Sequence, residues 1–339
     1  MTDSLYTTQW PVIGHSWAVA QLARSLNHDR VRHAYLITGP QGVGKTTFAK
    51  AFAQAVNCLA DHSRPCGVCR ACTLIADNHY ADVRIMQAEG TTLKIDQVRD
   101  MQHELSLRPV EARYRVVILR RFHEATLPAM DALLKTLEEP APYVILLLTT
   151  DTADNLLPTI KSRCQPINLR TLPAPTIRRA LEEHYQLDTE RATLLAQLSG
   201  GRMGWAIRAT ADESLLEERS QLLNILEEAL TQSRIGRFAL AESLSKDKPT
   251  LFRALELWQT YWRDVLLLSH STATPIANRD RRHTLQQIAV GVKTEDVQCV
   301  FAAIQRTTQY VDQNVNPRLA LEVLMLDLPR VKLFAAPPH

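Results

Sequence analysis

The residues best suited to chemistry form a glycine-rich segment, GPQGVGKTT, at positions 39–47. Gly39 to Thr46 spell G-x-x-x-x-G-K-T, after the apolar run AYLIT and before a segment with helical spacing. Glycines in that context let backbone N–H groups close around phosphate oxygens at a helix N-terminus. The motif therefore predicts a phosphate-binding loop, in which Lys45 reaches the β and γ phosphates of ATP or ADP and Thr46 offers its hydroxyl to Mg²⁺. The residues expected to hold the phosphates are Gly39, Gly42, Gly44, Lys45, Thr46 and Thr47.

Nucleotide hydrolysis also needs an acidic residue that holds Mg²⁺ at the end of a neighbouring strand. The natural strand for it, VVIL at 116–119, is followed by Arg120 and Arg121 instead. Glu124 would have to bend back to act in their place, and Asp151, after YVILLLTT, is an alternative acid. We interpret the chain as one that binds nucleotide but hydrolyses it poorly or not at all.

Four cysteines lie close together in the segment CLADHSRPCGVCRAC, with the pattern C-x7-C-x2-C-x2-C. Thiolates at x2 spacing can hold one ion from a tight turn, and four of them complete a tetrahedral Zn²⁺ shell with no open position. The cluster therefore predicts a structural zinc site rather than a catalytic one. Its expected ligands are Cys58, Cys66, Cys69 and Cys72.

Other readings of the cysteines stay open at this stage. Three cysteines at x2 spacing also begin an iron–sulfur pattern, but Ala76 occupies the place of the next ligand. His62 or His79 could replace one thiol as a zinc ligand, or the thiols could be free. Cys164 and Cys299 stand alone in the sequence and are expected to be buried apolar residues.

Apolar runs alternate with helical patterns between about residues 30 and 170. Strands are expected at 34–38, 82–86, 116–119 and 143–149. Because continuous apolar strands separated by helices are typical of parallel sheets, we expect an α/β region with helices on both faces of the sheet.

A junction follows at TLPAPT, residues 171–176, because its prolines break both helix and strand. Three short helices are expected near 176–185, 189–199 and 203–210. From about residue 212 onward the pattern is helical throughout, and its leucine stripes predict the core of a helix bundle.

The composition sets broad limits on the class of protein. The 339 residues carry a formal net charge of +3, which is too small to indicate nucleic-acid binding by itself. No apolar run is long enough to span a membrane, and MTDSLYTTQW lacks the pattern of a secretory signal. These observations favour a cytoplasmic protein of two or three domains with no membrane partner.

Four further segments are similar to segments of a known protein family. They are VIGHSWAVAQLARSL at 12–26, DALLKTLEEP at 131–140, TIKSRC at 159–164 and NPRLALEVLMLDL at 316–328. Together with the phosphate loop and the cysteine cluster, they resemble the AAA+ clamp-loader subunits of bacterial DNA polymerase III over nearly the whole chain. The resemblance implies a P-loop, RecA-like AAA+ domain with a zinc module, then a small three-helix lid, then an all-α helical collar that joins five subunits in a ring. The implied boundaries are 1–170 for the nucleotide-binding domain, 58–72 for the zinc module within it, 171–211 for the lid and 212–339 for the collar.

Two departures place the sequence closer to one branch of that family. The motor branch, gamma/tau, has Asp-Glu after the second strand and an arginine in the lid. Here Arg120 and Arg121 align with the acidic pair, and Gly204 of GGRMGWA aligns with the lid arginine. Both are features of the non-hydrolysing delta prime branch. The intact loop departs from those delta primes whose loop has decayed, so nucleotide binding remains an expectation.

The resemblance also assigns roles to single residues. Val12 and Ile13 would lie near the adenine. Thr150 would sense the γ phosphate, with Thr149 as the adjacent alternative. Arg163 would be an arginine finger that acts in trans on the ATP site of a neighbouring motor subunit. A guanidinium is always charged and binds phosphate oxygens bidentately, which suits that role.

The implied partners are other clamp-loader subunits, of the gamma/tau and delta types, in a hetero-oligomeric ring at the replisome. The sliding clamp would be an indirect partner, and primed DNA would bind without sequence specificity. Candidate DNA contacts are Lys94, Arg99, Arg108 and Arg113, although a solvated helix face also explains them. The chain is not expected to be catalytic by itself within the polymerase holoenzyme.

Three points stay open from sequence. Glu138 and Glu139 oppose the dipole of the helix that ends there, and either solvation or an interface role explains them. An autonomous gamma/tau-type motor is an alternative function. A zinc-containing P-loop kinase is an alternative from a different class.

Overall fold

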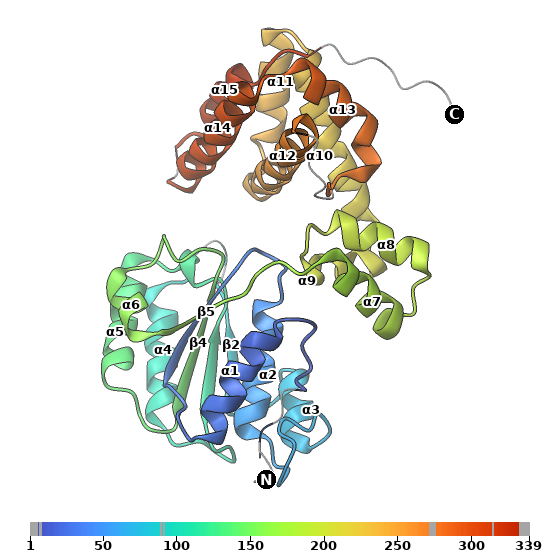
Figure 1. The fold of residues 1–339 in the computed structure, drawn as a ribbon. Coiled ribbons are helices and arrows are strands. Elements are labelled where there is room, and N and C mark those ends of the chain that lie inside the picture. Colours follow the sequence, from blue (N-terminus) through green and yellow to red (C-terminus); the bar gives the residue numbers. More distant parts are fainter. Residues whose placement is uncertain are drawn as a thin grey trace. The chain divides into compact units, whose positions relative to one another are not determined.

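The computed structural model describes residues 6, 9–88, 90, 92–270, 276–313 and 315–331. The chain divides into two compact units (Figure 1). Unit 1 comprises Met1–Gln186 together with Gly201–Trp205, and unit 2 comprises Leu187–Gly200 together with Ala206–His339. No helix among the described residues is long and apolar enough to cross a membrane.

Unit 1 is built on a five-stranded parallel sheet with the order β2-β3-β4-β1-β5. Its strands are β1 (Ala34–Thr38), β2 (Val83–Met86), β3 (Arg115–Leu119), β4 (Val144–Thr150) and β5 (Gln165–Asn168). The register pairs Thr38 with Thr150 at the carboxyl ends of β1 and β4. The segments that follow these two strands therefore start side by side.

Both faces of the sheet are covered by helices, as Figure 1 shows. Successive strand residues point to opposite faces, so Ile37 and Leu147 pack in one apolar cluster while Leu36 and Leu146 pack in another. The first cluster includes residues of α1 (Ser16–Asn27), α2 (Lys45–Asn57) and α3 (Arg70–Ala76), and the second those of α4 (Ile95–Ser106), α5 (Leu127–Glu138) and α6 (Pro158–Arg163). The predicted α/β fold is confirmed.

The four expected strands occur within one residue of their predicted ends, but β5 was not predicted. It has only four residues, contains Pro166 and buries one side chain, Ile167. It lies at the edge of the sheet, where a proline is tolerated because one side of the strand needs no ladder hydrogen bonds. Such a strand has too little apolar alternation to stand out in the sequence.

The three short helices predicted after residue 171 are α7 (Ala174–Tyr185), α8 (Thr189–Leu198) and α9 (Met203–Ala211). Chain contacts assign α7 to unit 1 and α8 to unit 2, while α9 begins in unit 1 and ends in unit 2. The further division into a lid and a collar stays a prediction.

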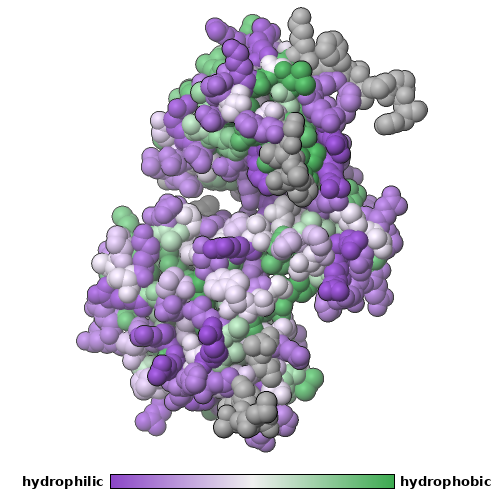
Figure 2. Space-filling view, viewed as in Figure 1, coloured by the Kyte–Doolittle hydropathy of each residue, from purple (hydrophilic) through white to green (hydrophobic). Residues whose placement is uncertain are grey.

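Beyond α9, the described residues are helical throughout and contain no strand, as predicted. The helices are α10 (Ser214–Thr231), α11 (Arg234–Leu244), α12 (Lys248–Ser269), α13 (Arg282–Gly291), α14 (Thr294–Asp312) and α15 (Pro317–Asp327), with a 3₁₀ turn at Arg279–Arg281. Trp258 and Trp262 of α12 are fully buried in the apolar cluster of these helices. In the view of Figure 2, hydrophilic residues cover most of the described surface.

The buried guanidinium group of Arg237 connects three helices of this bundle. Arg237 of α11 donates to the carbonyl oxygens of Met325 and Leu328 at 2.8 and 2.7 Å, and to that of Ala229 in α10 at 2.7 Å. The last carbonyls of a helix lack intrahelical partners and carry partial negative charge, so a guanidinium suits them. This contact ties α10, α11 and α15 together.

A buried carboxylate fixes the turn that leads into β3. Asp82, almost fully buried before β2, accepts hydrogen bonds from the backbone N–H groups of Val110, Glu111 and Ala112 at 2.9 to 3.0 Å. Arg115 adds an ion pair at 3.1 Å. Burial raises the pKa of Asp82, but these hydrogen bonds outweigh it and hold the pKa below its ordinary value.

We expect Asp82→Asn to lower the free energy of unfolding at neutral pH by about 3 kcal/mol, because Arg115 and the turn amides lose their charged partner. A lowered pKa in the folded state means that this contribution is present above the ordinary carboxyl pKa and is lost as the pH falls through the folded value. Urea unfolding at several pH values measures it. Asp131→Asn, at an exposed site on α5, is the control; equal stability of the two variants would contradict the assignment.

Candidate functional site

The phosphate loop lies between β1 and α2, as predicted. Gly42 and Gly44 have φ angles of 81° and 109°, in the region that glycine adopts most readily. A Cβ atom at Gly39 would lie 2.4 Å from the carbonyl oxygen of Leu169, so only glycine fits there. Thr46 and Thr47 stand in the first turn of α2.

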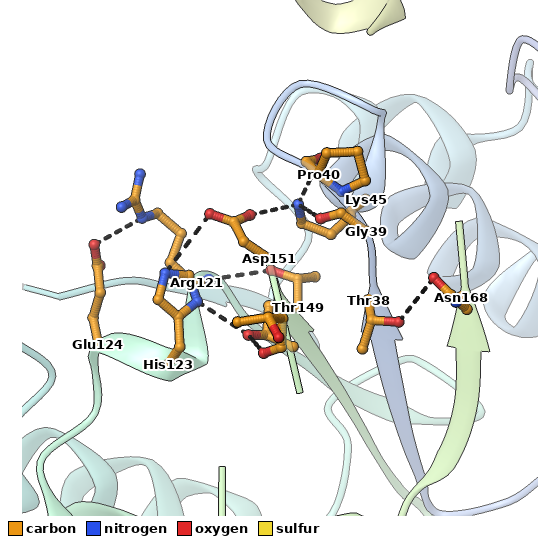
Figure 3. Close-up of polar contacts among 12 residues, drawn as sticks. Thr38, Gly39, Pro40, Lys45, Arg121, His123, Glu124, Thr149, Asp151 and Asn168 are labelled. Carbon is orange, nitrogen blue, oxygen red and sulfur yellow. Dashed lines mark hydrogen bonds and ion pairs between the residues drawn. The ribbon is translucent and has the colours of Figure 1, made fainter. Parts of the chain in front are cut away.

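Lys45 turns its ammonium group back into the loop (Figure 3). Its side chain is 8% exposed, and Nζ donates to the carbonyl oxygens of Gly39 at 2.5 Å and Pro40 at 3.0 Å. A third contact joins Nζ to Oδ1 of Asp151 at 2.7 Å. A buried ammonium requires such acceptors, and here the protein itself supplies them.

The two arginines after β3 do not face this ammonium group. Arg120 donates to Gln87 at 3.0 Å. Arg121 has a φ of 50°, and its side chain forms an ion pair with Glu124 at 2.7 Å (Figure 3). Glu124 is therefore held by Arg121, and the carboxylate that reaches Lys45 is that of Asp151.

His123 is a residue of this site that was not anticipated from the sequence. Its Nδ1 lies 3.1 Å from Oγ1 of Thr150, and its Nε2 lies 3.8 Å from Oδ2 of Asp151. Burial lowers the pKa of His123, and the charge of Asp151 only partly offsets that effect. Its place two residues after Arg121 was the available signal, but the pairing of β3 with β4 is needed to bring it to Thr150.

Thr150 and Thr149 are both buried at the end of β4, but they make different contacts. Thr150 donates to the carbonyl of Thr152 at 2.6 Å and faces His123. Thr149 accepts from the backbone N–H of Arg121 at 3.2 Å. Of the two, Thr150 is therefore the one grouped with Asp151.

The segment that contains Val12 and Ile13 is joined to the phosphate loop. Both side chains are partly buried, and Val12 packs against the apolar cluster of α1 and α2. His15 follows, and its Nε2 lies 3.2 Å from the carbonyl oxygen of Val43 in the loop. A carbonyl only accepts, so Nε2 carries the proton. Contact with an adenine stays a prediction.

Gly204 lies against the phosphate loop. Its backbone N–H donates to the carbonyl oxygen of Gly42 at 2.7 Å. A Cβ atom at Gly204 would lie 2.9 Å from that oxygen, closer than real Cβ contacts. Glycine at this position therefore permits a direct backbone contact with the phosphate loop.

Arg163 ends α6 and is 35% exposed. Its Nη2 forms an ion pair with Oε1 of Glu138 at 2.7 Å, and its Nη1 donates to the carbonyl of Thr159 at 3.0 Å. Glu138 stands in the last turn of α5, where its charge opposes the helix dipole. Pairing with Arg163 accounts for Glu138, a question that the sequence left open.

The four clustered cysteines lie together in space. Their Sγ atoms are all within 4.8 Å of one another, and those of Cys58 and Cys69 are 3.9 Å apart. Tetrahedral zinc with bonds of about 2.3 Å sets its sulfur ligands about 3.8 Å apart, so the cluster fits this ion. His62 and His79 are exposed and do not belong to the group.

The surroundings of the thiols differ. Burial raises the pKa of Cys58 and of Cys72. Burial acts in the same sense on Cys69, but hydrogen bonds from backbone and neighbouring thiols bring its pKa down to about 6. Backbone N–H groups also donate to sulfur, from Cys66 to Cys58 and from Cys69 to Cys66, each at 3.3 Å. Such bonds favour thiolate, the form that binds a metal.

The two isolated cysteines behave differently from each other. Cys164 is buried, and burial raises its pKa to about 12. Cys299 is exposed on α14, so its predicted burial is wrong. Cys299 lies on the solvent-exposed face of an amphipathic helix. Its exposure could not be predicted from its residue type, because cysteine is usually buried.

Of the four basic residues proposed for DNA, Arg99 and Arg113 form ion pairs with Asp96 and Asp29, at 3.8 and 3.1 Å. Lys94 is the N-cap residue of α4, and Arg108 is exposed. Partial pairing with carboxylates favours the solvated-face account for Arg99 and Arg113.

Elemental analysis of the purified protein should find about one zinc per chain, since four thiolates complete one shell. Cys66→Ser should lose most of the metal and lower the melting temperature. Cys299→Ser, an exposed cysteine outside the cluster, should keep both unchanged. Full zinc content in Cys66→Ser would contradict the four-cysteine site.

Gly204→Ala should destabilise the protein by about 1–3 kcal/mol, because its Cβ forces the loop and α9 apart. Gly291→Ala is the matched control, since a Cβ atom there would meet Val331 at an ordinary 3.7 Å. Thermal unfolding compares them. If the two variants melt together, the contact between Gly204 and Gly42 has no energetic role.

Known proteins resemble this chain along most of its length. A family model described as "DNA polymerase III, delta subunit" matches residues 14–173, and one described as "DNA polymerase III, delta subunit, C terminal" matches residues 213–329. The DNA polymerase III subunit delta' of Bacillus subtilis is 28% identical over 91% of this chain and 94% of its own length.

Subunit gamma/tau of Mycobacterium tuberculosis is 30% identical over 72% of this chain. The chain spans only 44% of the length of that relative. Among solved structures, a gamma subunit-related protein of Thermotoga maritima aligns over 90% of this chain with a TM-score of 0.40 and 18% identity. The two family models together with the delta' relative confirm the resemblance inferred from the sequence: the chain belongs to the family of bacterial DNA polymerase III clamp-loader subunits.

Proposed function

We propose that this chain is a delta-prime-like subunit of the DNA polymerase III clamp loader, one that activates a neighbour's ATPase without hydrolysing ATP itself. The observation that carries the proposal is the pair Arg120 and Arg121 at the end of β3, where a motor needs a Mg²⁺-binding acid. The nearby Glu124 is paired with Arg121 at 2.7 Å. No acid at the end of β3 is thus left to hold the metal.

Arg163 is the residue through which such a subunit would act. It stands at the end of α6 and is partly exposed, so a phosphate of a neighbouring subunit could replace Glu138 as its partner. A guanidinium stabilises the charge that spreads over the transferred phosphoryl group, and fingers of this kind are worth about 10³–10⁵ in rate.

Nucleotide in this chain's own loop would have a static role. Gly39, Gly42, Gly44, Lys45, Thr46 and Thr47 would enclose the phosphates, Thr150 would face the γ phosphate, and Val12 and Ile13 would contact the adenine. Zn²⁺ on the four cysteines would stabilise the segment between α2 and α3.

The partners proposed for the chain are gamma/tau-type and delta-type subunits in a ring. An exposed apolar stripe on α15 supports the collar contact, because Leu319, Val323 and Leu326 recur at helical spacing on one face. The ring would place the sliding clamp on primed DNA, with backbone contacts that weaken as salt increases.

A gamma/tau-type motor is the second candidate, favoured by the position of Asp151. Its carboxylate lies 2.7 Å from Nζ of Lys45 and could hold Mg²⁺ in place of an acid after β3. The arginines after β3 and the glycine at position 204 weigh against this function.

The test of the proposal is ATP turnover by a loader reconstituted with the sliding clamp and primed DNA. Arg163→Ala should leave assembly intact but slow the one site that receives this finger by about 10³-fold, which removes its share of turnover. Lys161→Ala removes a positive charge from the same helix and should keep full turnover. Equal turnover for the Arg163→Ala and unmodified complexes would limit Arg163 to its ion pair with Glu138.

A further inference from the structure

Two segments that follow adjacent strands meet at the phosphate loop. Thr38 and Thr150 are register partners, so Gly39 and Asp151 each begin the segment beyond the sheet at the same edge. The parallel arrangement therefore brings Asp151 to the loop without any long connection. Figure 3 shows its carboxylate between Lys45 and His123.

The contacts of Lys45 are complete without a ligand. An ammonium group has three N–H donors. Here Nζ lies within 3.0 Å of three oxygen acceptors, on Gly39, Pro40 and Asp151. Of these three contacts, the one with Asp151 is to a charged group, and charge-assisted hydrogen bonds are about twice as strong as neutral ones.

His123 lies beside the other carboxylate oxygen of Asp151. Oδ2 of Asp151 lies 3.8 Å from Nε2 of His123, and His123 is in turn 3.1 Å from Oγ1 of Thr150. The carboxylate is about one-third exposed, whereas Lys45 is buried. Asp151 is thus the more exposed partner of the ion pair, and its carboxylate is the part of the pair that is open to solvent.

We propose that Asp151 is an internal competitor for the phosphate site, which holds Lys45 by its carboxylate and thereby sets a low affinity for nucleotide. This inference rests on the proposed binding of nucleotide through Lys45. A β or γ phosphate oxygen must accept the hydrogen bond that Lys45 now donates to Asp151. The carboxylate also repels the incoming phosphates, so both effects act in the same direction.

The competitor role makes the opposite prediction from a role in holding Mg²⁺. A competitor lowers the affinity for nucleotide with and without the metal. A metal ligand raises the affinity only when Mg²⁺ is present. Removal of the carboxylate separates the two roles by the sign of the change.

The experiment is calorimetric titration of the full chain with ADP and with ATP, each with Mg²⁺ and with EDTA. Asp151→Asn keeps the shape of the side chain and removes its charge, and Asp151→Ala is the second variant in case the amide finds a new partner. Asp154→Asn is the matched control, because this carboxylate lies in the same loop but bonds to Thr152. Thermal unfolding verifies that each variant is folded.

We expect Asp151→Asn and Asp151→Ala to bind both nucleotides about tenfold more tightly than the unmodified chain, with and without Mg²⁺, and Asp154→Asn to change affinity by less than about twofold. Equal affinity of all variants, or weaker binding of the Asp151 variants, would overturn the proposal. Absence of binding in every variant would also overturn it. That last result would leave the action of Arg163 untouched, because loader turnover tests it independently.

Discussion

The arrangement of residues at the carboxyl edge of the sheet depends on the buried ammonium group of Lys45, which requires oxygen acceptors around it. A cation removed from water needs acceptors close by, and two loop carbonyls and Asp151 supply them. The loop carbonyls of Gly39 and Pro40 therefore bind the side chain of the lysine at the end of the same loop. The parallel register of β1 and β4 is what makes the contact with Asp151 available, because it sets Asp151 directly beside the loop.

The rest of the loop is secured by residues far apart in sequence. His15 contacts the carbonyl of Val43, and the N–H of Gly204 contacts that of Gly42. The segment before β1 and the start of α9 thus converge on a loop of six residues between Thr38 and Lys45. These contacts connect the phosphate loop to segments on both sides of it in the sequence.

Local sequence patterns were enough to predict part of the fold and part of the candidate site. The phosphate loop and the cysteine cluster depend on spacing within a few residues, so their positions were predicted correctly. The α/β sheet and the helical remainder follow from periodicity, which also located four strands and the helices after residue 171. The short edge strand β5 was missed because it buries only Ile167.

The pairings across the site could not be predicted. Glu138 with Arg163 and Lys45 with Asp151 join residues separated by 25 or more positions, and only the packing of α5 on α6 and of β1 on β4 brings them together. His123 was not predicted for the same reason, since it lies in a 3₁₀ turn after β3 while its partner Thr150 lies on β4. Cys299 shows the converse error, because residue type alone suggested burial on a face that is exposed.

The measurement that tests the central claim most directly is ATP turnover by the purified chain, alone and together with a gamma/tau-type subunit. The account predicts no turnover by the chain alone and enhanced turnover when the partner is present. Turnover by the chain alone would mean that another acid, such as Asp151, holds Mg²⁺, and it would contradict the assignment of this chain as a non-hydrolysing subunit.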